Sequence, residues 1–283
     1  MATKSVDIVC PLYNASEYIE GLHNSLLKQK NVEIKNFKYV LTEGKDNTEE
    51  YLINNKINYR KIKREEFSHS LTREKEAMLS DADVVVFITQ DVVIEDELWL
   101  YNLVKDIDDK EIVAAYSRQL TKYNNLEKYT RECNYPDKDS IKSKEDIEKY
   151  GLKTFFFSDA ASAINTKVFK SLNGYDNKNL PISEDMYIAY KIIMNGYKIK
   201  YCSDSVVYHS HKFTLKEIYD RYKLTGKFFK QNSYLDQYGT NGSGASLAKY
   251  ILKRIFQEKR FLLLFRYPFD MAARFIGMKV GKR

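Results

Sequence analysis

A run of seven residues, 83–89, constrains the fold of this chain more than any other segment. Its sequence, Asp-Val-Val-Val-Phe-Ile-Thr, is apolar without alternation, which is typical of a strand buried on both faces. Similar signals predict strands at residues 6–10, 37–42 and 58–62, and helices at residues 17–28, 48–53 and 71–79. Strands that alternate with helices in this way predict a parallel sheet with right-handed crossovers.

The second half of the chain continues this pattern less regularly. Strands are predicted at residues 154–164, 198–203 and 205–208, and helices at residues 166–172 and 183–195. Thr214 and Glu217 form a capping box that starts a helix reaching about Gln231. Residues 124–153 are polar and without clear periodicity, so we expect an excursion over the rim of the sheet rather than a core element. Residues 242–244, Gly-Ser-Gly, are predicted to form a flexible joint.

The positive charge is concentrated in the C-terminal segment. Residues 247–283 contain ten lysines and arginines against Glu258 and Asp270, whereas the rest of the chain carries a charge of −1. This asymmetry predicts an acidic partner surface. A nucleic-acid-binding module needs basic residues interleaved with aromatic ones across the fold, so we expect no nucleic acid.

The same segment has the pattern of a membrane-surface helix. Residues 250–260 alternate apolar and basic faces, and residues 261–275 are rich in Phe, Leu and Arg, as in helices that lie in an anionic bilayer interface. The alternatives are a basic helix packed on the core and an oligomer contact. No apolar run approaches the roughly 18 residues of a spanning helix.

The cysteines and the N-terminal residues bear on the compartment. Cys10, Cys133 and Cys202 are odd in number, far apart and without metal-ligand spacing, which predicts no disulfide framework and suits a reducing compartment. The first residues contain no apolar secretory signal. We therefore expect a cytoplasmic protein that does not span a membrane.

Several polar side chains are predicted to lie on one rim of the sheet. Ligands of an open α/β sheet bind beyond the carboxyl ends of the strands, which places residues 11–14, 42–46 and 89–91 together. Asp91 there suits Mg²⁺ or Mn²⁺, although it is also a candidate N-cap for a helix at 92–100. His209 and His211 share one face of a strand and can both reach one ion.

Two charged positions have both a functional and a structural interpretation. Glu184 and Asp185 begin a predicted helix, where the helix dipole favours carboxylates in any protein. A partly desolvated carboxylate at this position is also a candidate general base for an acceptor hydroxyl. Arg73 offers a planar fork of donors that matches a diphosphate, or else it is an exposed helix residue.

Taken in order, segments of the chain resemble the family 2 glycosyltransferases of the GT-A fold, and among them the bacterial rhamnosyltransferases. The similarity covers about residues 5–230. Its segments are Val-Cys-Pro-Leu-Tyr-Asn-Ala-Ser-Glu-Tyr (9–18), Phe-Ser-His-Ser-Leu-Thr-Arg (67–73), Phe-Ile-Thr-Gln-Asp (87–91), Asn-Tyr-Pro (134–136), Phe-Ser-Asp-Ala-Ala-Ser-Ala-Ile (157–164), Ser-Glu-Asp (183–185), Gly-Tyr-Lys-Ile-Lys-Tyr (196–201) and Val-Tyr-His-Ser-His (207–211).

The resemblance implies an inverting transferase with a GT-A domain at residues 1–232 and a helical tail at residues 233–283. Residues 1–116 would bind the nucleotide-sugar and residues 117–232 the acceptor. Asp185 would be the catalytic base, and Asp91, His209 and His211 would hold Mn²⁺ or Mg²⁺. The implied substrate-binding residues are Pro11, Tyr13, Asn14, Glu17, Thr42, Glu43, His69, Arg73, Gln90, Asp91, Asp159 and Glu184.

The expected substrates also follow from the resemblance. The donor would be dTDP-rhamnose, and the acceptor a lipid-linked saccharide in surface polysaccharide synthesis, at the inner face of the plasma membrane. The alternatives are a UDP-hexose or UDP-N-acetylhexosamine donor, and a catalytically silent relative. A sugar-nucleotidyltransferase is excluded, because no Gly-rich basic loop follows the first strand.

The sequence departs from the family pattern in two places. Residues 42–48 are one residue shorter than the family's Asp-Ser-Gly-Ser-Thr-Asp-Gly-Thr segment, with Thr42 or Glu43 in the place of its early Asp. Thr89 replaces the first carboxylate of the family's Asp-x-Asp motif. We therefore expect altered nucleobase contacts and weak or phosphate-dependent metal binding.

Overall fold

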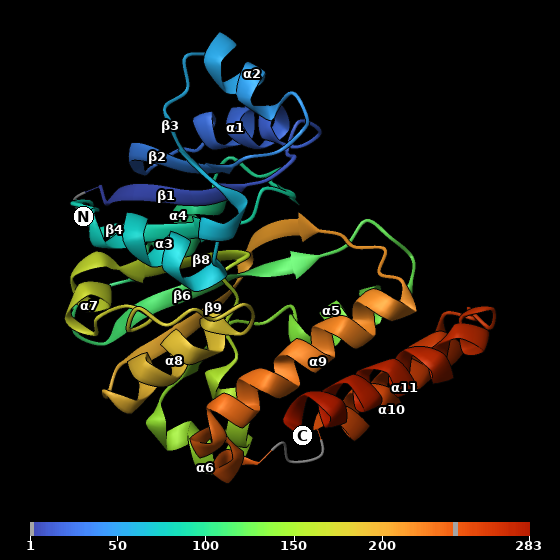
Figure 1. The fold of residues 1–283 in the computed structure, drawn as a ribbon. Coiled ribbons are helices and arrows are strands. Elements are labelled where there is room, and N and C mark those ends of the chain that lie inside the picture. The colour runs from blue at the N-terminus through green and yellow to red at the C-terminus, as the bar shows by residue number, and fades with distance from the viewer. Residues whose placement is uncertain (1–2, 240–242) are drawn as a thin grey trace.

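The computed structural model describes residues 3–239 and 243–283, which are shown in Figure 1. Within these residues nine strands form one sheet in the order β3-β2-β1-β4-β8-β6-β9-β5, with β7 beside β9. The strands are β1 (Ser5–Leu12), β2 (Glu33–Thr42), β3 (Tyr59–Ile62), β4 (Val84–Ile88), β5 (Val92–Val93), β6 (Ile112–Leu120), β7 (Ser140–Lys142), β8 (Ala161–Asn165) and β9 (Lys198–His209). The helices are α1 (Ile19–Leu27), α2 (Thr48–Asn54), α3 (His69–Met78), α4 (Trp99–Val104), α5 (Leu126–Asn134), α6 (Ile147–Tyr150), α7 (Thr166–Ser171), α8 (Glu184–Met194), α9 (Leu215–Gln231), α10 (Ser243–Gln257) and α11 (Leu263–Lys282).

Strand β4 lies at the centre of the molecule and explains its layered architecture. Val84, Val86 and Ile88 face a core formed with α1, α2 and α4, whereas Val85 and Phe87 face a second core formed with α3, α7 and α8. Because successive side chains of a strand point to opposite faces, a continuous apolar run fills both cores. The prediction of a doubly buried strand between two helical layers is confirmed.

The sheet is parallel in its first half and mixed in its second. β1 pairs in parallel with β2 and β4, and β2 pairs in parallel with β3, as the alternating pattern predicted. β8 then runs antiparallel between β4 and β6, and β6 is again parallel to β9. The α/β class is confirmed, and the antiparallel insertion brings residues from the second half of the chain next to β4.

Several element predictions differ from the structure. Residues 198–209 form the single strand β9, with a register irregularity against β6 in place of a break. Of the predicted strand 154–164, only residues 161–164 are extended, as part of β8, and residues 151–155 form a 3₁₀ turn. Strands β5, β6 and β7 were not predicted from the sequence. Of the predicted joint, Gly242 lies outside the described residues and Gly244 belongs to α10.

The prediction of an excursion at residues 124–153 was wrong for α5. Leu126 and Tyr129 of this helix are buried against Ile251 and Ile255 of α10. The apolar side of this helix is covered by an element more than 100 residues away in the sequence. The mostly polar composition of the segment alone therefore did not indicate a buried helix. The segment is therefore a support for the C-terminal helices.

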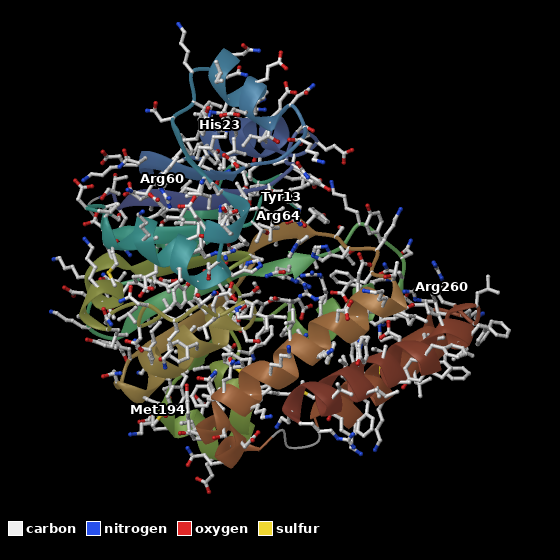
Figure 2. All side chains as sticks on the ribbon, in the orientation of Figure 1. Tyr13, His23, Arg60, Arg64, Met194 and Arg260 are labelled. Carbon is white, nitrogen blue, oxygen red and sulfur yellow. The ribbon has the colours of Figure 1, made fainter. Side chains whose placement is uncertain are left out.

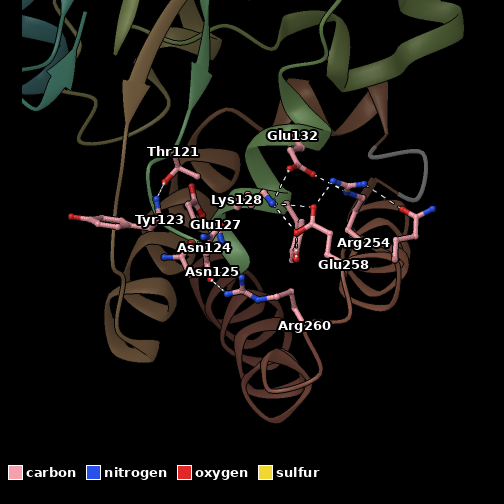
Figure 3. Close-up of polar contacts among 12 residues, drawn as sticks. Thr121, Tyr123, Asn124, Asn125, Glu127, Lys128, Glu132, Arg254, Glu258 and Arg260 are labelled. Carbon is pink, nitrogen blue, oxygen red and sulfur yellow. Dashed lines mark hydrogen bonds and ion pairs between the residues drawn. The ribbon is translucent and has the colours of Figure 1, made fainter. Parts of the chain in front are cut away.

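The C-terminal helices pack on the rest of the protein with one side. Figure 3 shows the polar contacts between α5 and the end of α10, where Lys128 contacts Glu258 at 2.7 Å and Arg254 contacts Glu132 at 2.9 Å. α11 runs along α9 (Figure 1), and a Cβ atom at Gly277 would meet the carbonyl oxygen of Tyr219 at 2.5 Å. Among the described residues, no helix is both long and apolar enough to cross a bilayer.

Candidate active site

Two loops at the carboxyl ends of β1 and β2 are tied to each other. Oδ1 of Asn14 accepts a hydrogen bond from the backbone nitrogen of Lys45 at 2.9 Å, and Oγ1 of Thr48 accepts one from that of Ala15 at 2.7 Å. Asn14 has a positive φ of 46°, which asparagine tolerates better than most residues. A Cβ atom at Gly44 would collide with Oδ1 of Asn14, so only glycine allows this close approach. The loops of the predicted rim are therefore held together by hydrogen bonds between them.

Gln90 joins the first loop to the end of β4. Its Oε1 accepts a hydrogen bond from the backbone nitrogen of Tyr13 at 2.7 Å, and its Nε2 donates to the carbonyl oxygen of Tyr13 at 2.9 Å. The ring of Tyr13 lies under Arg64, 5.4 Å from ring centroid to guanidinium carbon, and both are labelled in Figure 2. Gln90 was predicted to bind substrate, and its amide forms hydrogen bonds with the backbone of Tyr13.

The remaining predicted nucleotide-side residues differ in exposure. Glu43 is exposed and lines a pocket of about 250 Å³ with Asp46 and Lys61. Thr42 is buried, and its Oγ1 has no hydrogen-bond partner among the described residues. Pro11 is half-buried in β1 and Glu17 is exposed just before α1. Thr42 is thus turned into the protein, and Glu43 is the accessible member of the pair.

Asp91, His209 and His211 lie together in the structure. Oδ2 of Asp91 is 3.4 Å from Nε2 of His209 and 3.8 Å from Nδ1 of His211, and the Nε2 atoms of the two histidines are 2.7 Å apart. Pairing of Val92 with His209 between β5 and β9 produces this arrangement. The alternative in which Asp91 caps a helix at 92–100 is wrong, because Val92 and Val93 form a strand.

The donor atoms of this cluster fit a divalent cation. One donor atom from each of the three residues lies within 4.8 Å of the other two, which is close enough for all three to reach one ion. Burial lowers the pKa of His209 and lowers that of His211 to about 3, so both rings are neutral and carry a lone pair. A carboxylate with two neutral imidazoles is a donor set that Mn²⁺ accepts.

A second cluster of charges is buried beside the start of α8. Nη1 of Arg73 donates to Oε1 of Glu184 at 3.3 Å and to the carbonyl oxygen of His69 at 3.0 Å. Asp159 is buried, and its two oxygens accept hydrogen bonds from Ser162 at 2.8 Å and Tyr175 at 2.7 Å. Arg73 and Asp159 were predicted to contact substrate, and both are enclosed by protein. Arg73 is likewise not the exposed helix residue of the alternative interpretation.

Asp185 is more accessible than its neighbours in this cluster. It is half-buried, and its Oδ1 accepts a hydrogen bond from the backbone nitrogen of Met186 at 2.7 Å. Ser183 precedes it with a left-handed φ of 62°, which turns the chain sharply into α8. Burial raises the pKa of Asp185, and the nearby Glu184 and Asp159 raise it further. A half-exposed carboxylate with a raised pKa is suited to accept a proton.

His69 and the space beside the histidines complete the site. His69 is exposed at the start of α3, edge-on to Phe67. A pocket of about 220 Å³ adjoins the histidine pair, and its lining includes Gln119, Arg131, Ser158, His209 and His211. Gln119 and Arg131 were not predicted from the sequence. They lie on β6 and α5, two elements that were not predicted, and no local motif marks them.

Comparison with known proteins identifies related sequences. The model of the family "Glycosyl transferase family 2" matches residues 7–172. The O-antigen chain rhamnosyltransferase RfbN of Salmonella typhimurium is 33% identical over 283 residues, covering 98% of this chain and 89% of the relative. The O-antigen chain rhamnosyltransferase WbaN of Salmonella anatum is 32% identical over 285 residues, with the same coverage of 98% and 89%.

Solved structures with low sequence identity share the fold. The mannosyltransferase PcManGT of Pyrobaculum calidifontis, determined with GDP-Man and Mn²⁺, superposes with a TM-score of 0.67 at 13% identity, covering 99% of this chain and 87% of that chain. S. aureus TarS 1-349 in complex with UDP gives a TM-score of 0.55 at 16% identity, covering 97% and 90%. The similarity to these structures extends through the C-terminal helices.

Proposed function

Because the chain belongs to glycosyl transferase family 2 and is a glycosyltransferase with the expected GT-A fold, we propose that it transfers L-rhamnose from dTDP-rhamnose to a saccharide acceptor. The observation that carries the proposal is the near full-length similarity to two O-antigen chain rhamnosyltransferases. The acceptor is then a growing surface polysaccharide, most simply one linked to a lipid. Residues 1–232 perform the transfer, and residues 233–283 hold the enzyme at the membrane surface near the acceptor.

The proposed reaction is a single displacement with Asp185 as the base. The acceptor hydroxyl oxygen forms a bond to the anomeric carbon from the face opposite the diphosphate. The bond between this carbon and the diphosphate oxygen breaks, and the nucleoside diphosphate leaves with the electron pair. Asp185 takes the hydroxyl proton, for which its half-buried position and raised pKa are suited. One displacement inverts the configuration at the anomeric carbon.

The neighbouring residues prepare the base and the donor. Arg73 offsets the charge of Glu184 and favours its ionised form, so that Glu184 competes less with Asp185 for a proton. Gln90 holds Tyr13 at the donor side of the site. Asp91, His209 and His211 would hold Mn²⁺ or Mg²⁺. Such a cation, when bound, supplies positive charge beside the leaving diphosphate.

The C-terminal helices provide a surface for a membrane. α10 and α11 form the end of the molecule opposite α2 in Figure 1. Phe265 is 77% exposed and Leu262 is 83% exposed, and Phe261, Phe269 and Ile276 are exposed as well. The side of α11 that faces α9 is packed on the protein, in line with the interpretation of a helix packed on the core. The membrane-surface interpretation then applies to the opposite, exposed side. We propose that the exposed side binds the anionic inner face of the plasma membrane through these apolar groups and the surrounding cations.

A donor screen tests the proposed activity. The protein is heated with each of a set of nucleotide-sugars, with and without Mn²⁺ or Mg²⁺, and the midpoint of unfolding is measured. We expect dTDP-rhamnose to give the largest increase, and the increase to grow with the cation. Selective stabilisation by a UDP-hexose or UDP-N-acetylhexosamine would replace the rhamnosyl assignment with a different donor in the same family.

A further inference from the structure

We propose that Gln119 and Arg131 are positioning residues that fix the tautomer of His209 and so direct its Nε2 lone pair toward a bound divalent cation. The proposal rests on the cation site assigned under the proposed function, but not on the identity of the donor sugar. It concerns two buried residues that lie outside all the sequence segments that resemble the family. The side chains form a continuous chain from α5 through β6 to β9.

Arg131 determines the orientation of the Gln119 amide. Nη1 of Arg131 contacts Oε1 of Gln119, and a guanidinium carries only hydrogen-bond donors. The amide oxygen must therefore face the arginine, and the amide nitrogen points the other way and donates to Oγ of Ser158 at 2.8 Å. Gln119 and Arg131 are both buried, with 1% and 7% of their surface exposed, which limits the access of water to these contacts. Arg131 is itself positioned by Glu127, one helical turn earlier, at 3.5 Å.

The same amide oxygen then determines the tautomer of His209. Nδ1 of His209 lies 2.9 Å from Oε1 of Gln119, and a carbonyl oxygen can only accept, so the hydrogen of the neutral ring must be on Nδ1. Nε2 is left without a hydrogen. It lies 2.7 Å from Nε2 of His211, which can donate to it in the cation-free protein, and 3.4 Å from Oδ2 of Asp91. The lone pairs of Nε2 and Oδ2 do not attract each other directly, and a cation between them would accept both. A metal-bound histidine usually donates its other nitrogen in this way.

The tautomer can be measured directly. The chain contains four histidines, so protein labelled with ¹⁵N-histidine gives few imidazole signals, and a His209→Asn variant assigns the relevant pair. In the cation-free wild type we expect Nδ1 of His209 to have the chemical shift of a protonated nitrogen and Nε2 that of a bare one. In Gln119→Met, which keeps the side-chain length but has no acceptor, we expect the ring to populate the opposite tautomer. Gln119→Glu keeps an acceptor and should keep the wild-type tautomer.

Affinity for Mn²⁺ alone is the second measurement, followed by the electron paramagnetic resonance signal of the free ion. Gln119→Met should weaken binding about 10- to 100-fold, as loss of such hydrogen bonds does in other metal sites. Gln119→Glu should bind within about threefold of the wild type, and Arg131→Met should weaken binding in the same direction as Gln119→Met. Arg118→Met is the control, because Arg118 lies on the opposite face of β6 and should bind as the wild type does.

The order of the variants separates positioning from packing. If Gln119 only fills space, the apolar Met should be tolerated better than the buried charge of Glu, in both the spectrum and the affinity. That order would overturn the proposal, as would equal Mn²⁺ binding by wild type and Gln119→Met, including no binding by either. Neither measurement uses a sugar nucleotide. A failed donor screen would therefore refute the rhamnosyl assignment and leave the positioning role standing.

Discussion

Nη1 of Arg73 lies 3.3 Å from Oε1 of Glu184 in a pair that is almost closed to solvent, with side chains 3% and 10% exposed. Asp159 and Asp185 belong to the same cluster, so this one guanidinium serves three carboxylates. Burial raises the pKa of Asp159 to about 6, against the opposing effect of Arg73. The arginine therefore limits how far the carboxylates beside it are protonated.

Replacing Arg73 with Met should move the pH dependence of the transfer. Arg73 lowers the pKa of Asp185, so its removal raises that pKa further, and the base is deprotonated only at higher pH. We expect the acidic limb of the kcat profile to shift upward, and the free energy of unfolding to fall by about 3–5 kcal/mol. Lys216→Met is the control, because Lys216 pairs with Asp220 at the surface, with side chains 85% and 47% exposed. An unchanged acidic limb in Arg73→Met would contradict this role.

Asp185→Asn should remove transfer while leaving donor binding intact. The amide has nearly the same shape but cannot accept a proton, and loss of a general base costs about 10²- to 10⁴-fold in rate. Turnover is measured by release of the nucleoside diphosphate, and binding by thermal stabilisation with the donor. Asp204→Asn, which alters an exposed pair with Lys105, should behave as wild type. An active Asp185→Asn enzyme would end the assignment of the base.

The fold was predictable where local sequence decides it. The apolar run at 83–89 and the capping box at Thr214 both became the expected elements, because burial on two faces and a capped helix start are encoded by adjacent residues. α5 was not predictable, since Leu126 and Tyr129 are covered by helices near the end of the chain. The burial of its few apolar residues therefore depends on helices that the local sequence does not reveal.

The grouping of Asp91 with His209 and His211 was predictable from the sequence, but the orientation of other candidate side chains was not. Asp91 and His209 are separated by more than 100 residues, and they meet because β5, which was not predicted, pairs with β9. Arg73 and Asp159 carry the right chemistry for a substrate but face inward, because Glu184 and Tyr175 offer them partners. The direction of a polar side chain depends on contacts that the sequence does not display.

The enzyme should depend on a divalent cation. A chelator should remove activity, and Mn²⁺ or Mg²⁺ should restore it. Asp91→Asn should lower the rate about 100-fold or more, because positive charge beside the leaving group contributes several kcal/mol to the transition state. Asp106→Asn, at a surface pair with Lys200, provides a control with the same substitution. Full activity in the presence of the chelator would refute the role of Asp91, His209 and His211.

Gly277 should be required for the packing of α11 on α9. In Gly277→Ala the new Cβ would lie 2.5 Å from the carbonyl oxygen of Tyr219 and 3.0 Å from Cβ of Tyr222, so the helices must separate. We expect a loss of about 1–3 kcal/mol in the free energy of unfolding. Gly21→Ala is the matched control, because no atom lies within 4 Å of its new Cβ and alanine should stabilise α1 by about 0.5–1 kcal/mol. Urea unfolding of both variants measures the difference. Equal effects would show that the close approach does not matter.

The exposed face of α11 should determine binding to anionic vesicles. In the full-length protein, Phe265→Ser together with Phe269→Ser removes two exposed apolar groups without touching the side packed on α9. We expect partition into phosphatidylglycerol vesicles to fall about 10-fold or more, since a buried Phe contributes about 1.5–3 kcal/mol. Wild-type binding should also weaken as salt is added, because the cations of the tail are screened. Leu79→Ser, at a residue 68% exposed after α3, should bind vesicles like the wild type. If the double variant co-sediments as well as the wild type does, the membrane is not held by this face, and the exposed phenylalanines must meet another surface.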